Sequence, residues 1–140
     1  MSCGVLLVTH GKLGHFLLDT LRDMMGELPL KADVLEVRRV QAHDGLLLQG
    51  ARMLDNLDSG AGVLVLTDAY GSTPSNIANK LSALRNNVEV VAGVNLPMLM
   101  RLFNYAQFDL PKLAQAAVEG GQRGVTLCPR AAPPTPSETP

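Results

Sequence analysis

Aromatic residues make up only 4% of this 140-residue chain, which has no tryptophan, two tyrosines and three phenylalanines. A flavin ring is usually held between aromatic side chains, so this scarcity argues against a flavin site. Cysteine is scarce as well. Cys3 and Cys128 lack metal-ligand spacing, and we expect two reduced thiols rather than a disulfide.

The chain also has no large excess of positive or negative charge, and it has no long hydrophobic run. The 12 basic and 13 acidic side chains leave a formal net charge of -1, which gives no long-range attraction to nucleic acid or anionic lipid. No apolar run approaches the ~20 residues that span a bilayer. No basic region precedes the first apolar stretch, as a signal peptide requires. We therefore expect a cytoplasmic protein that neither inserts into a membrane nor binds nucleic acid.

Several common catalytic motifs are absent. The sequence has no Walker lysine motif, no G-x-G-x-x-G and no nucleophile-elbow serine. Its His, Cys and Glu residues do not have the spacing of a metal site. We therefore expect no cofactor, no metal and no nucleotide site.

The composition is that of one globular domain with a short tail. Hydrophobic residues make up 46% of the chain, enough for a packed core at this length. Residues 129–140 (PRAAPPTPSETP) are rich in proline and offer almost nothing to bury. We predict a domain over residues 1–128 and a disordered proline-rich tail over 129–140.

Short apolar runs with β-branched residues recur along the chain and are typical of buried strands. They are GVLLVT (4–9), VLEV (34–37), GVLVLT (62–67) and VEVVAGV (88–94). Helical spacing of apolar residues fills the segments that follow, at 13–24, 44–57, 74–85, 97–106 and 111–119. Alternating strands and helices predict an α/β fold with a parallel sheet covered on both faces. GVTL at 124–127 is a candidate fifth strand at an edge.

Caps and buried faces follow from the same patterns. We expect Asp44 and Thr73 to cap the second and third helices and Gly120-Gly121 to end the last one. The predicted buried stripe of the first helix is Leu13, Phe16, Leu17, Thr20, Leu21 and Met24. That of the second is Leu47, Ala51, Leu54 and Leu57.

His10 and Asp68 each follow an apolar strand, the first and the third. Ligands of open α/β sheets sit beyond the carboxyl ends of the strands, where the strand order reverses. In a flavodoxin-like order the first and third strands are neighbours ~4.8 Å apart, so the imidazole and the carboxylate would face each other. Such a carboxylate fixes one ring tautomer and leaves the other nitrogen as a nucleophile.

Small polar residues surround this pair. Gly71, Ser72 and Thr73 supply backbone N–H groups and hydroxyls that lead into a helix start, a favourable place for an anion. Gly11 allows a phosphoryl group or a partner loop to approach the ring. An imidazole nucleophile with an anion cradle, but without a nucleotide motif, points to a protein phosphodonor.

Other interpretations stay open on the residues alone. A histidine at a strand end is more often structural, and Asp68 can be a plain turn carboxylate. A flavodoxin-like regulatory module without transfer chemistry therefore remains an alternative. Arg38 and Arg39 leave the second strand near the same edge, either to guide an anionic partner or as solvated charges. His43 is either part of a docking surface or an ordinary loop histidine.

Three segments resemble a known family. VLLVTHG (5–11), VLVLTDAYGSTPSNIANKL (63–81) and VVAGVNLPML (90–99) are similar, in order and spacing, to the mannose-type EIIA component of the bacterial sugar phosphotransferase system. The resemblance implies a flavodoxin-like sheet of order 2-1-3-4. It also implies a homodimer in which the last strand, here 124–127, pairs with the other subunit.

The resemblance also implies roles for individual residues. His10 would be phosphorylated, with Asp68 as its hydrogen-bonded catalytic partner. Phosphoryl-binding residues would be Gly11, Gly71, Ser72 and Thr73, and site-shaping residues Thr9, Tyr70, Asn95, Pro97 and Met98. Two positions depart from the family pattern: Tyr70 stands where tryptophan is common, and Ser72 where glycine is common.

The partners are implied in the same way. The donor would be phospho-HPr, charged by enzyme I from phosphoenolpyruvate, and the acceptor an EIIB domain or a regulatory target. A related alternative is the phosphotransferase subunit of dihydroxyacetone kinase, which uses the same histidine loop and passes phosphate to ADP on a partner. The V-N-x-P-M segment fits the mannose type better.

Overall fold

The predicted apolar runs form one parallel sheet in the computed structural model, which describes residues 1–135. Its strands, in the order β2-β1-β3-β4, confirm the predicted arrangement. They are β1 (Gly4–His10), β2 (Ala32–Val37), β3 (Val63–Thr67) and β4 (Val88–Ala92). β1 pairs with β2 on one side and with β3 on the other, so the strand order changes direction at β1.

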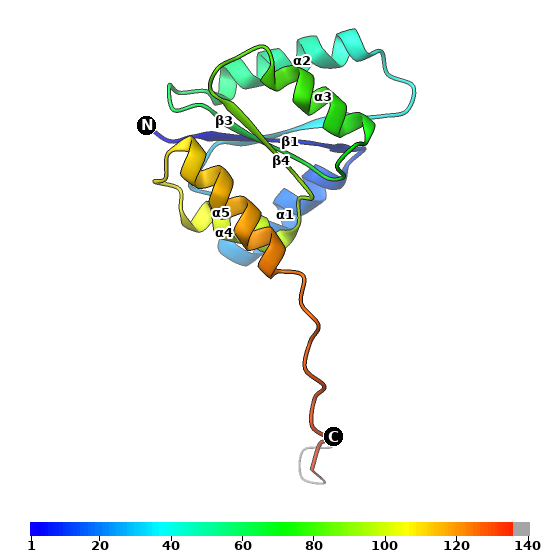
Figure 1. Cartoon of the computed structure of the whole chain (residues 1–140), viewed down its shortest axis with the longest axis vertical. Coiled ribbons are helices and arrows are strands. Elements are labelled where there is room, and N and C mark those ends of the chain that lie inside the picture. The colour runs from blue at the N-terminus through cyan, green and yellow to red at the C-terminus, as the bar shows by residue number, and fades with distance from the viewer. Residues whose placement is uncertain (136–140) are drawn as a thin grey trace.

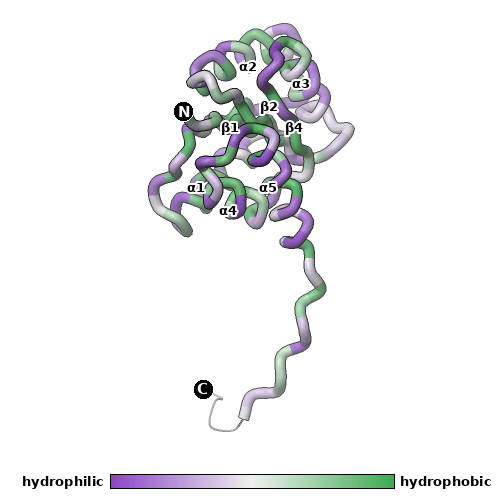
Figure 2. Tube along the Cα trace, turned by 60° about the vertical axis from the view of Figure 1, so that its left-hand side comes forward, coloured by the Kyte–Doolittle hydropathy of each residue, from purple (hydrophilic) through white to green (hydrophobic). Residues whose placement is uncertain are grey.

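Helices cover both faces of this sheet (Figure 1), as predicted. They are α1 (Leu13–Met25), α2 (His43–Leu57), α3 (Thr73–Ser82), α4 (Leu96–Asn104) and α5 (Leu110–Arg123). One layer contains α2 and α3, and the other contains α1, α4 and α5. The hydropathy colouring in Figure 2 shows hydrophobic strands lying between these layers.

Alternate residues of the central strands feed two separate cores. In β1, Leu6 and Val8 pack with the buried face of α2 and α3, which includes Leu54 and Ile77. Val5 and Leu7 belong to the other cluster, with buried residues of α1, α4 and α5. This two-sided burial explains why the strands are continuous apolar runs rather than alternating ones.

Two helices are rotated from the predicted faces, each around a glycine. In α1 the buried residues are Gly14, Leu18 and Leu21, and Phe16 is 63% exposed. A Cβ at Gly14 would lie 2.8 Å from Val34 Cγ1, so the glycine lets α1 sit directly on the sheet. In α2 a Cβ at Gly50 would lie 2.7 Å from Leu81 Cδ1, so this glycine admits the Leu81 side chain of α3. The buried residues of α2 are Leu46, Gly50, Leu54 and Leu57, with Leu47 and Ala51 half-buried.

The predicted caps are displaced by one or two positions. α2 begins at His43 after Ala42, which makes no side-chain cap bond, and Asp44 lies within the first turn. An acidic side chain there still suits the positive end of the helix dipole. Ser72, not Thr73, caps α3, because its Oγ accepts from the Ser75 N–H.

Gly120 and Gly121 do not end α5, contrary to prediction. The helix continues to Arg123 because the two glycines face α4. A Cβ at Gly120 would lie within van der Waals overlap of the Arg101 side chain, and one at Gly121 would lie 2.9 Å from Met98 Cε. Close packing of α4 and α5, rather than chain termination, therefore explains this pair.

Beyond α5 the chain carries no helix or strand through residue 135, and these residues are exposed. The segment 124–127 thus forms no strand within this chain. The disordered tail proposed for 129–140 stays a prediction, and residues 136–140 lie outside the described residues. Cys3 is buried and Cys128 exposed, and both are free thiols. None of the described helices is long and apolar enough to cross a membrane.

Two glycine-to-alanine changes in helices should have opposite effects on stability. Gly120→Ala should lower the free energy of unfolding by about 1–3 kcal/mol, because the new methyl group overpacks the α4–α5 contact. Gly45→Ala should raise it by about 0.5–1 kcal/mol, since a Cβ at Gly45 meets nothing within 4 Å. Urea unfolding of both variants measures the difference. Equal effects of the two changes would contradict the packing role of Gly120.

Candidate functional site

The end of β1 and the loop after β3 bring His10 and Asp68 together, as the topology predicts. His10 is the last residue of β1 and lies beside the strand that Asp68 follows. His10 Nδ1 lies 2.7 Å from Asp68 Oδ2, and the backbone N–H of His10 donates to the same oxygen at 2.9 Å. The other oxygen, Oδ1, accepts from the Ala69 N–H at 3.0 Å. The carboxylate is therefore fixed by both its oxygens.

Burial and charge differ across this pair. The side chain of Asp68 is 10% exposed, whereas that of His10 is 58% exposed. Burial raises the pKa of Asp68, but hydrogen bonds from the backbone and ring of His10 outweigh it, so this pKa lies below its ordinary value. Asp68 is thus an acceptor at neutral pH, and Nδ1 carries the proton of their bond. Nε2 is left with a lone pair on an exposed ring.

A cavity of 170 Å³ opens beside His10. It lies between the end of β2, the loop that leads into α2, and the start of α3. Its lining residues are His10, Val37, Arg38, Arg39, His43 and Thr73. Of the predicted phosphoryl-binding residues, Thr73 is the one that lines this cavity. Val37 was missed by sequence reasoning, although it ends a strand adjacent to β1 and so reaches the same edge.

The loop after β3 uses its polar groups in two ways. Ser72 Oγ donates to the Ala69 carbonyl at 2.6 Å and accepts from the Ser75 N–H, so this hydroxyl is committed to the turn and the cap. Gly71 has a φ of 83°, a conformation that glycine adopts freely. The turn lets α3 begin beside His10. The predicted roles of Gly71 and Ser72 toward a phosphoryl group stay predictions.

Thr9 and Gly11 hold the chain on either side of the histidine. Thr9 is fully buried, and its Oγ1 accepts from the Gly14 N–H at 2.9 Å, which fixes the start of α1. Gly11 has a φ of 48°, and its N–H donates to the Val37 carbonyl at 3.0 Å. These bonds let the chain turn sharply after His10 while the ring stays exposed.

The remaining predicted site-shaping residues lie in other surroundings. Tyr70 is 88% exposed in the loop after β3. Asn95 caps α4 by accepting from the Met98 N–H at 2.8 Å, and it donates to the Gly121 carbonyl on α5. Met98 is buried in the core between these helices. The contacts of Asn95 and Met98 thus order α4 against α5, and any part they play at His10 stays a prediction.

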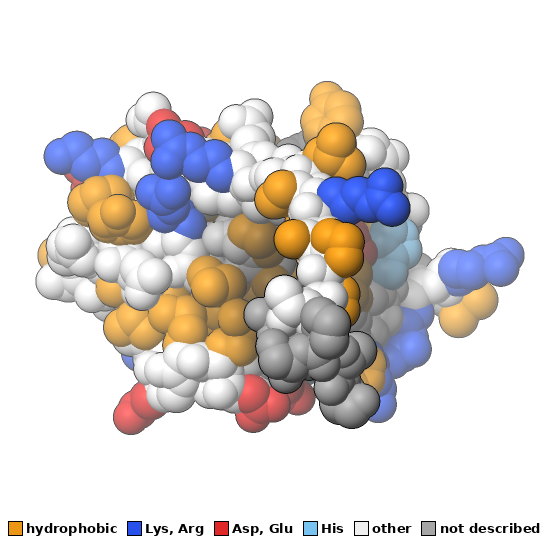
Figure 3. Space-filling model, turned by 90° about the horizontal axis from the view of Figure 1, so that it is seen from below, with side chains coloured by type: hydrophobic (Ala, Val, Ile, Leu, Met, Phe, Trp, Pro, Cys, Tyr) orange, Lys and Arg blue, Asp and Glu red, His pale blue; other side chains and the backbone are white. Residues whose placement is uncertain are grey.

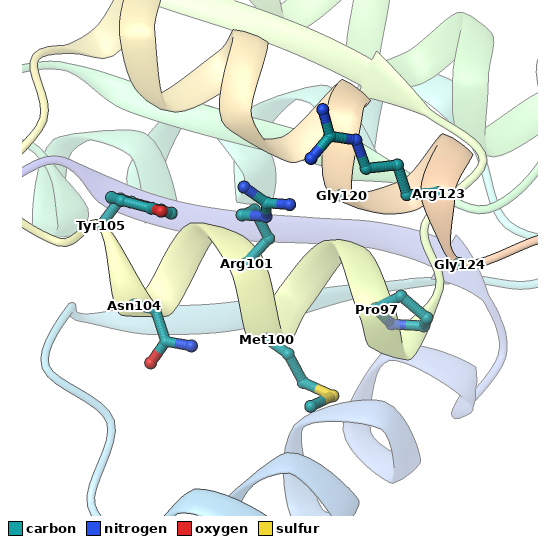
Figure 4. Close-up of a pocket in the computed structure, with 8 residues that line it drawn as sticks. All are labelled: Pro97, Met100, Arg101, Asn104, Tyr105, Gly120, Arg123 and Gly124. Atoms are coloured by element: carbon teal, nitrogen blue, oxygen red, sulfur yellow. The ribbon is translucent and has the colours of Figure 1, made fainter.

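Pro97 lines a larger groove of 440 Å³ on the outside of α4 and α5 (Figure 4). The other residues that line it are Met100, Arg101, Asn104, Tyr105, Gly120, Arg123 and Gly124. His10 and Asp68 are not among them. The chemistry expected of an imidazole nucleophile therefore belongs to the smaller cavity at the end of β1.

A second ionic network borders the site without entering it. Glu36 Oε1 lies 3.1 Å from His15 Nε2, and Glu36 Oε2 accepts from Arg38 at 2.9 Å. This network ties α1 to β2 and fixes one of the cavity's arginines. Within residues 1–135 no group of three or more His, Cys, Asp or Glu side chains has the arrangement of a metal site.

Comparisons with known proteins find relatives that match most of this chain. The family model EIIA-man, described as the PTS system fructose IIA component, matches residues 4–118. The PTS system mannose-specific EIIAB component of Escherichia coli strain K12 is 34% identical over 128 residues. That match covers 89% of this chain but only 39% of the relative, so the chain spans the smaller part of such proteins.

Solved structures share the fold. The mannose/sorbose specific IIA subunit of the phosphotransferase system from Enterococcus faecalis has a TM-score of 0.84 and 25% identity, and the match covers 96% of this chain and all of that one. The PTS IIA protein associated with the fucose utilization operon of Streptococcus pneumoniae has a TM-score of 0.77 and 24% identity, covering 91% and 96%. The second shows the fold alone.

Acid should remove a stabilising contribution of Asp68. The unfolded carboxyl titrates near pKa ~3.9, and the pKa of the folded one is lower. The unfolded state then binds more protons, so this contribution is fully present above the unfolded pKa and is lost as pH falls through the folded pKa.

The difference in free energy of unfolding between wild type and Asp68→Asn, measured from neutral pH down to pH 2, should therefore shrink in acid. Asp58, whose pKa is also lowered, mainly by a hydrogen bond from the Gly60 N–H, is present in both proteins and cancels. A difference that does not change with pH would contradict the hydrogen-bonded carboxylate.

Proposed function

The chain belongs to the mannose-type EIIA family, and on that premise we propose that it is a phosphocarrier that takes a phosphoryl group onto His10 and passes it to a partner protein. EIIA components of this type are phosphotransferase-type proteins of sugar phosphotransferase systems. The observation that carries the proposal is the 2.7 Å contact between His10 Nδ1 and Asp68 Oδ2, which leaves Nε2 on an exposed ring.

The transfer step follows from this tautomer. The lone pair of His10 Nε2 attacks the phosphorus of the donor's phosphohistidine, an N–P bond forms, and the donor's N–P bond breaks with its electron pair staying on the donor nitrogen. No proton has to move, because Nδ1–H stays in its bond to Asp68. The ring becomes positively charged as it is phosphorylated, and the carboxylate stabilises that charge. The second transfer, to the acceptor, reverses the same step.

The surroundings suit the incoming group. Thr73 starts α3, and the positive end of the helix dipole favours the phosphoryl oxygens. Gly11, Gly71 and Ser72 border the same edge of the sheet, and we assign them to phosphoryl binding with Thr73. Because phosphoryl transfer depends mainly on positioning and charge stabilisation, a fixed ring beside an anion-binding surface is sufficient machinery.

The partners are part of the proposal. Phospho-HPr would be the donor in the cytoplasm, and an EIIB domain or a regulatory protein the acceptor. The family match favours this assignment over the dihydroxyacetone kinase subunit and over a module without transfer chemistry. Both alternatives predict that labelled phosphate on the chain never passes to an EIIB domain.

A homodimer is a further part of the proposal. Among residues 1–135 nothing pairs with the outer edge of β4. A hollow of 240 Å³ lies beside that edge, lined by residues that include Val91, Ala92 and Val118. Val125 and Leu127 are 80% and 97% exposed, and their i, i+2 spacing is that of one strand face. We propose that 124–127 pairs with β4 of a second copy. Figure 3 shows exposed hydrophobic side chains on the side from which the tail emerges.

Labelling with phosphoenolpyruvate, enzyme I and HPr tests the carrier role. Wild type should acquire an acid-labile, base-stable phosphate on His10, and His10→Ala should acquire none. Asp68→Ala should fold but accept label about 10- to 100-fold more slowly, because the ring loses its orienting partner. His15→Ala, which changes a histidine of α1 engaged by Glu36, is the matched control and should label like wild type. Full labelling of His10→Ala would rule out the assignment.

Sedimentation of two matched variants tests the dimer. The double change Val125→Asp and Leu127→Asp should convert a dimer to a monomer, because it places charges on the exchanged strand. Leu48→Asp alters another exposed hydrophobic residue, on α2, and should remain dimeric. A monomeric wild type, or a dimeric double variant, would contradict strand exchange.

A further inference from the structure

The cavity beside His10 has a charged wall that the sequence motifs do not include. The predicted phosphoryl-binding residues come from the turn after β1 and from the loop before α3. The structure adds Arg38, Arg39 and His43, from the segment between β2 and α2, on the other side of the same cavity. Three basic side chains thus line a 170 Å³ space together with the nucleophilic ring.

These three side chains are not equally available. Arg38 is held by Glu36, with Nη2 2.9 Å from Oε2, and its charge is already paired. The side chains of Arg39 and His43 are exposed, and within residues 1–135 neither makes a hydrogen bond or an ion pair. Arg39 therefore carries a full unpaired charge at the cavity, and His43 an unpaired imidazole.

A phosphoryl group on His10 needs such charges. A phosphate ester or its analogue carries about -1.5 to -2 charges at neutral pH, and the carboxylate of Asp68 lies 2.7 Å from Nδ1 of the same ring. Thr73 offers neutral donors, and the hydroxyl of Ser72 is committed to the Ala69 carbonyl. Only a cationic side chain can offset the repulsion between the phosphoryl group and the Asp68 carboxylate. Of the two arginines that line the cavity, Arg39 is the one without an ion-pair partner among the described residues.

We propose that Arg39 and His43 bind the phosphoryl oxygens while the group is on His10, so that the segment between β2 and α2 forms the cationic wall of the site and Thr73 the neutral one. The guanidinium of Arg39 offers paired N–H donors that match phosphate geometry. His43 is the first residue of α2 and Thr73 the first of α3, so two helix dipoles add positive potential on the two sides. This inference rests on the proposed phosphocarrier function.

Binding of inorganic phosphate to the unphosphorylated chain tests the wall without any transfer. In proton NMR, the ring signals of His10 and His43 should shift saturably in wild type. Arg39→Gln should weaken this binding about tenfold, the scale of one hydrogen bond to a charged group. Arg22→Gln removes the same charge from an exposed arginine of α1 that pairs with Asp19, and should bind like wild type.

The phosphorylated chain gives a second readout. With phosphoramidate as a chemical donor, no donor protein has to dock, and ³¹P NMR follows the titration of the phosphoryl group on His10. Removing a cation that contacts this group should raise its pKa in Arg39→Gln and, to a smaller degree, in His43→Gln. Arg22→Gln should leave the titration unchanged. A merely structural role of Arg39 would not move this signal.

These experiments distinguish a failure of the proposed Arg39 and His43 contacts from a failure of the proposed phosphocarrier function. If wild type binds phosphate as described but never carries a phosphoryl group on His10, the phosphocarrier proposal fails and the anion site stands. If wild type is phosphorylated and Arg39→Gln matches it in phosphate affinity and ³¹P titration, the inference is overturned. A third outcome is that Arg39→Gln is labelled more slowly by phospho-HPr while its phosphate affinity and ³¹P titration match wild type. Arg39 would then contact the docking donor protein rather than the phosphoryl group, and the inference would also be overturned.

Discussion

One oxygen atom, Asp68 Oδ2, accepts both the backbone N–H and the ring Nδ1 of His10. A single bond to the ring would leave the imidazole free to swing about its χ angles. Two bonds from the same residue to one acceptor fix the backbone and the ring together, and the Ala69 N–H fixes the other oxygen. The tautomer and the direction of Nε2 are thus set by the ends of two neighbouring strands, before any partner arrives.

This contact depends on the order of the sheet. β1 lies between β2 and β3, so the chain first passes outward from β1 to β2 through α1 and then crosses back over β1 to β3 through α2 on the other face. The two connections diverge at the carboxyl end of β1, which is where open α/β sheets bind their ligands. Apolar residues fill both faces below it, with Val8 in one core and Leu7 in the other. Because the cores hold the strands in register, the polar residues just beyond them have no freedom to separate.

Sequence reasoning reached the parts of this arrangement that depend on period and topology. Apolar runs predicted the strands, and the switch point predicted that His10 and Asp68 meet. It failed where a residue has two physically acceptable uses. Gly120 and Gly121 can end a helix or admit a neighbouring one, and only the position of α4 decides. The same ambiguity hid the buried role of Gly14, and it led to the prediction that Thr73, rather than Ser72, caps α3.

The exposure of the site fits a carrier better than an enzyme that retains its substrate. A phosphoryl group must be held well enough to survive between two encounters, yet binding it more tightly before transfer than during transfer would slow its departure. The side chain of Asp68 is 10% exposed and held by three hydrogen bonds. On the proposed mechanism it stabilises the positive charge that develops on the ring during transfer. Arg39, by contrast, is exposed and unpaired, on a segment outside the helices. On the proposed mechanism, a docking protein can displace the exposed Arg39 from the phosphoryl group without disturbing the bond between His10 and Asp68.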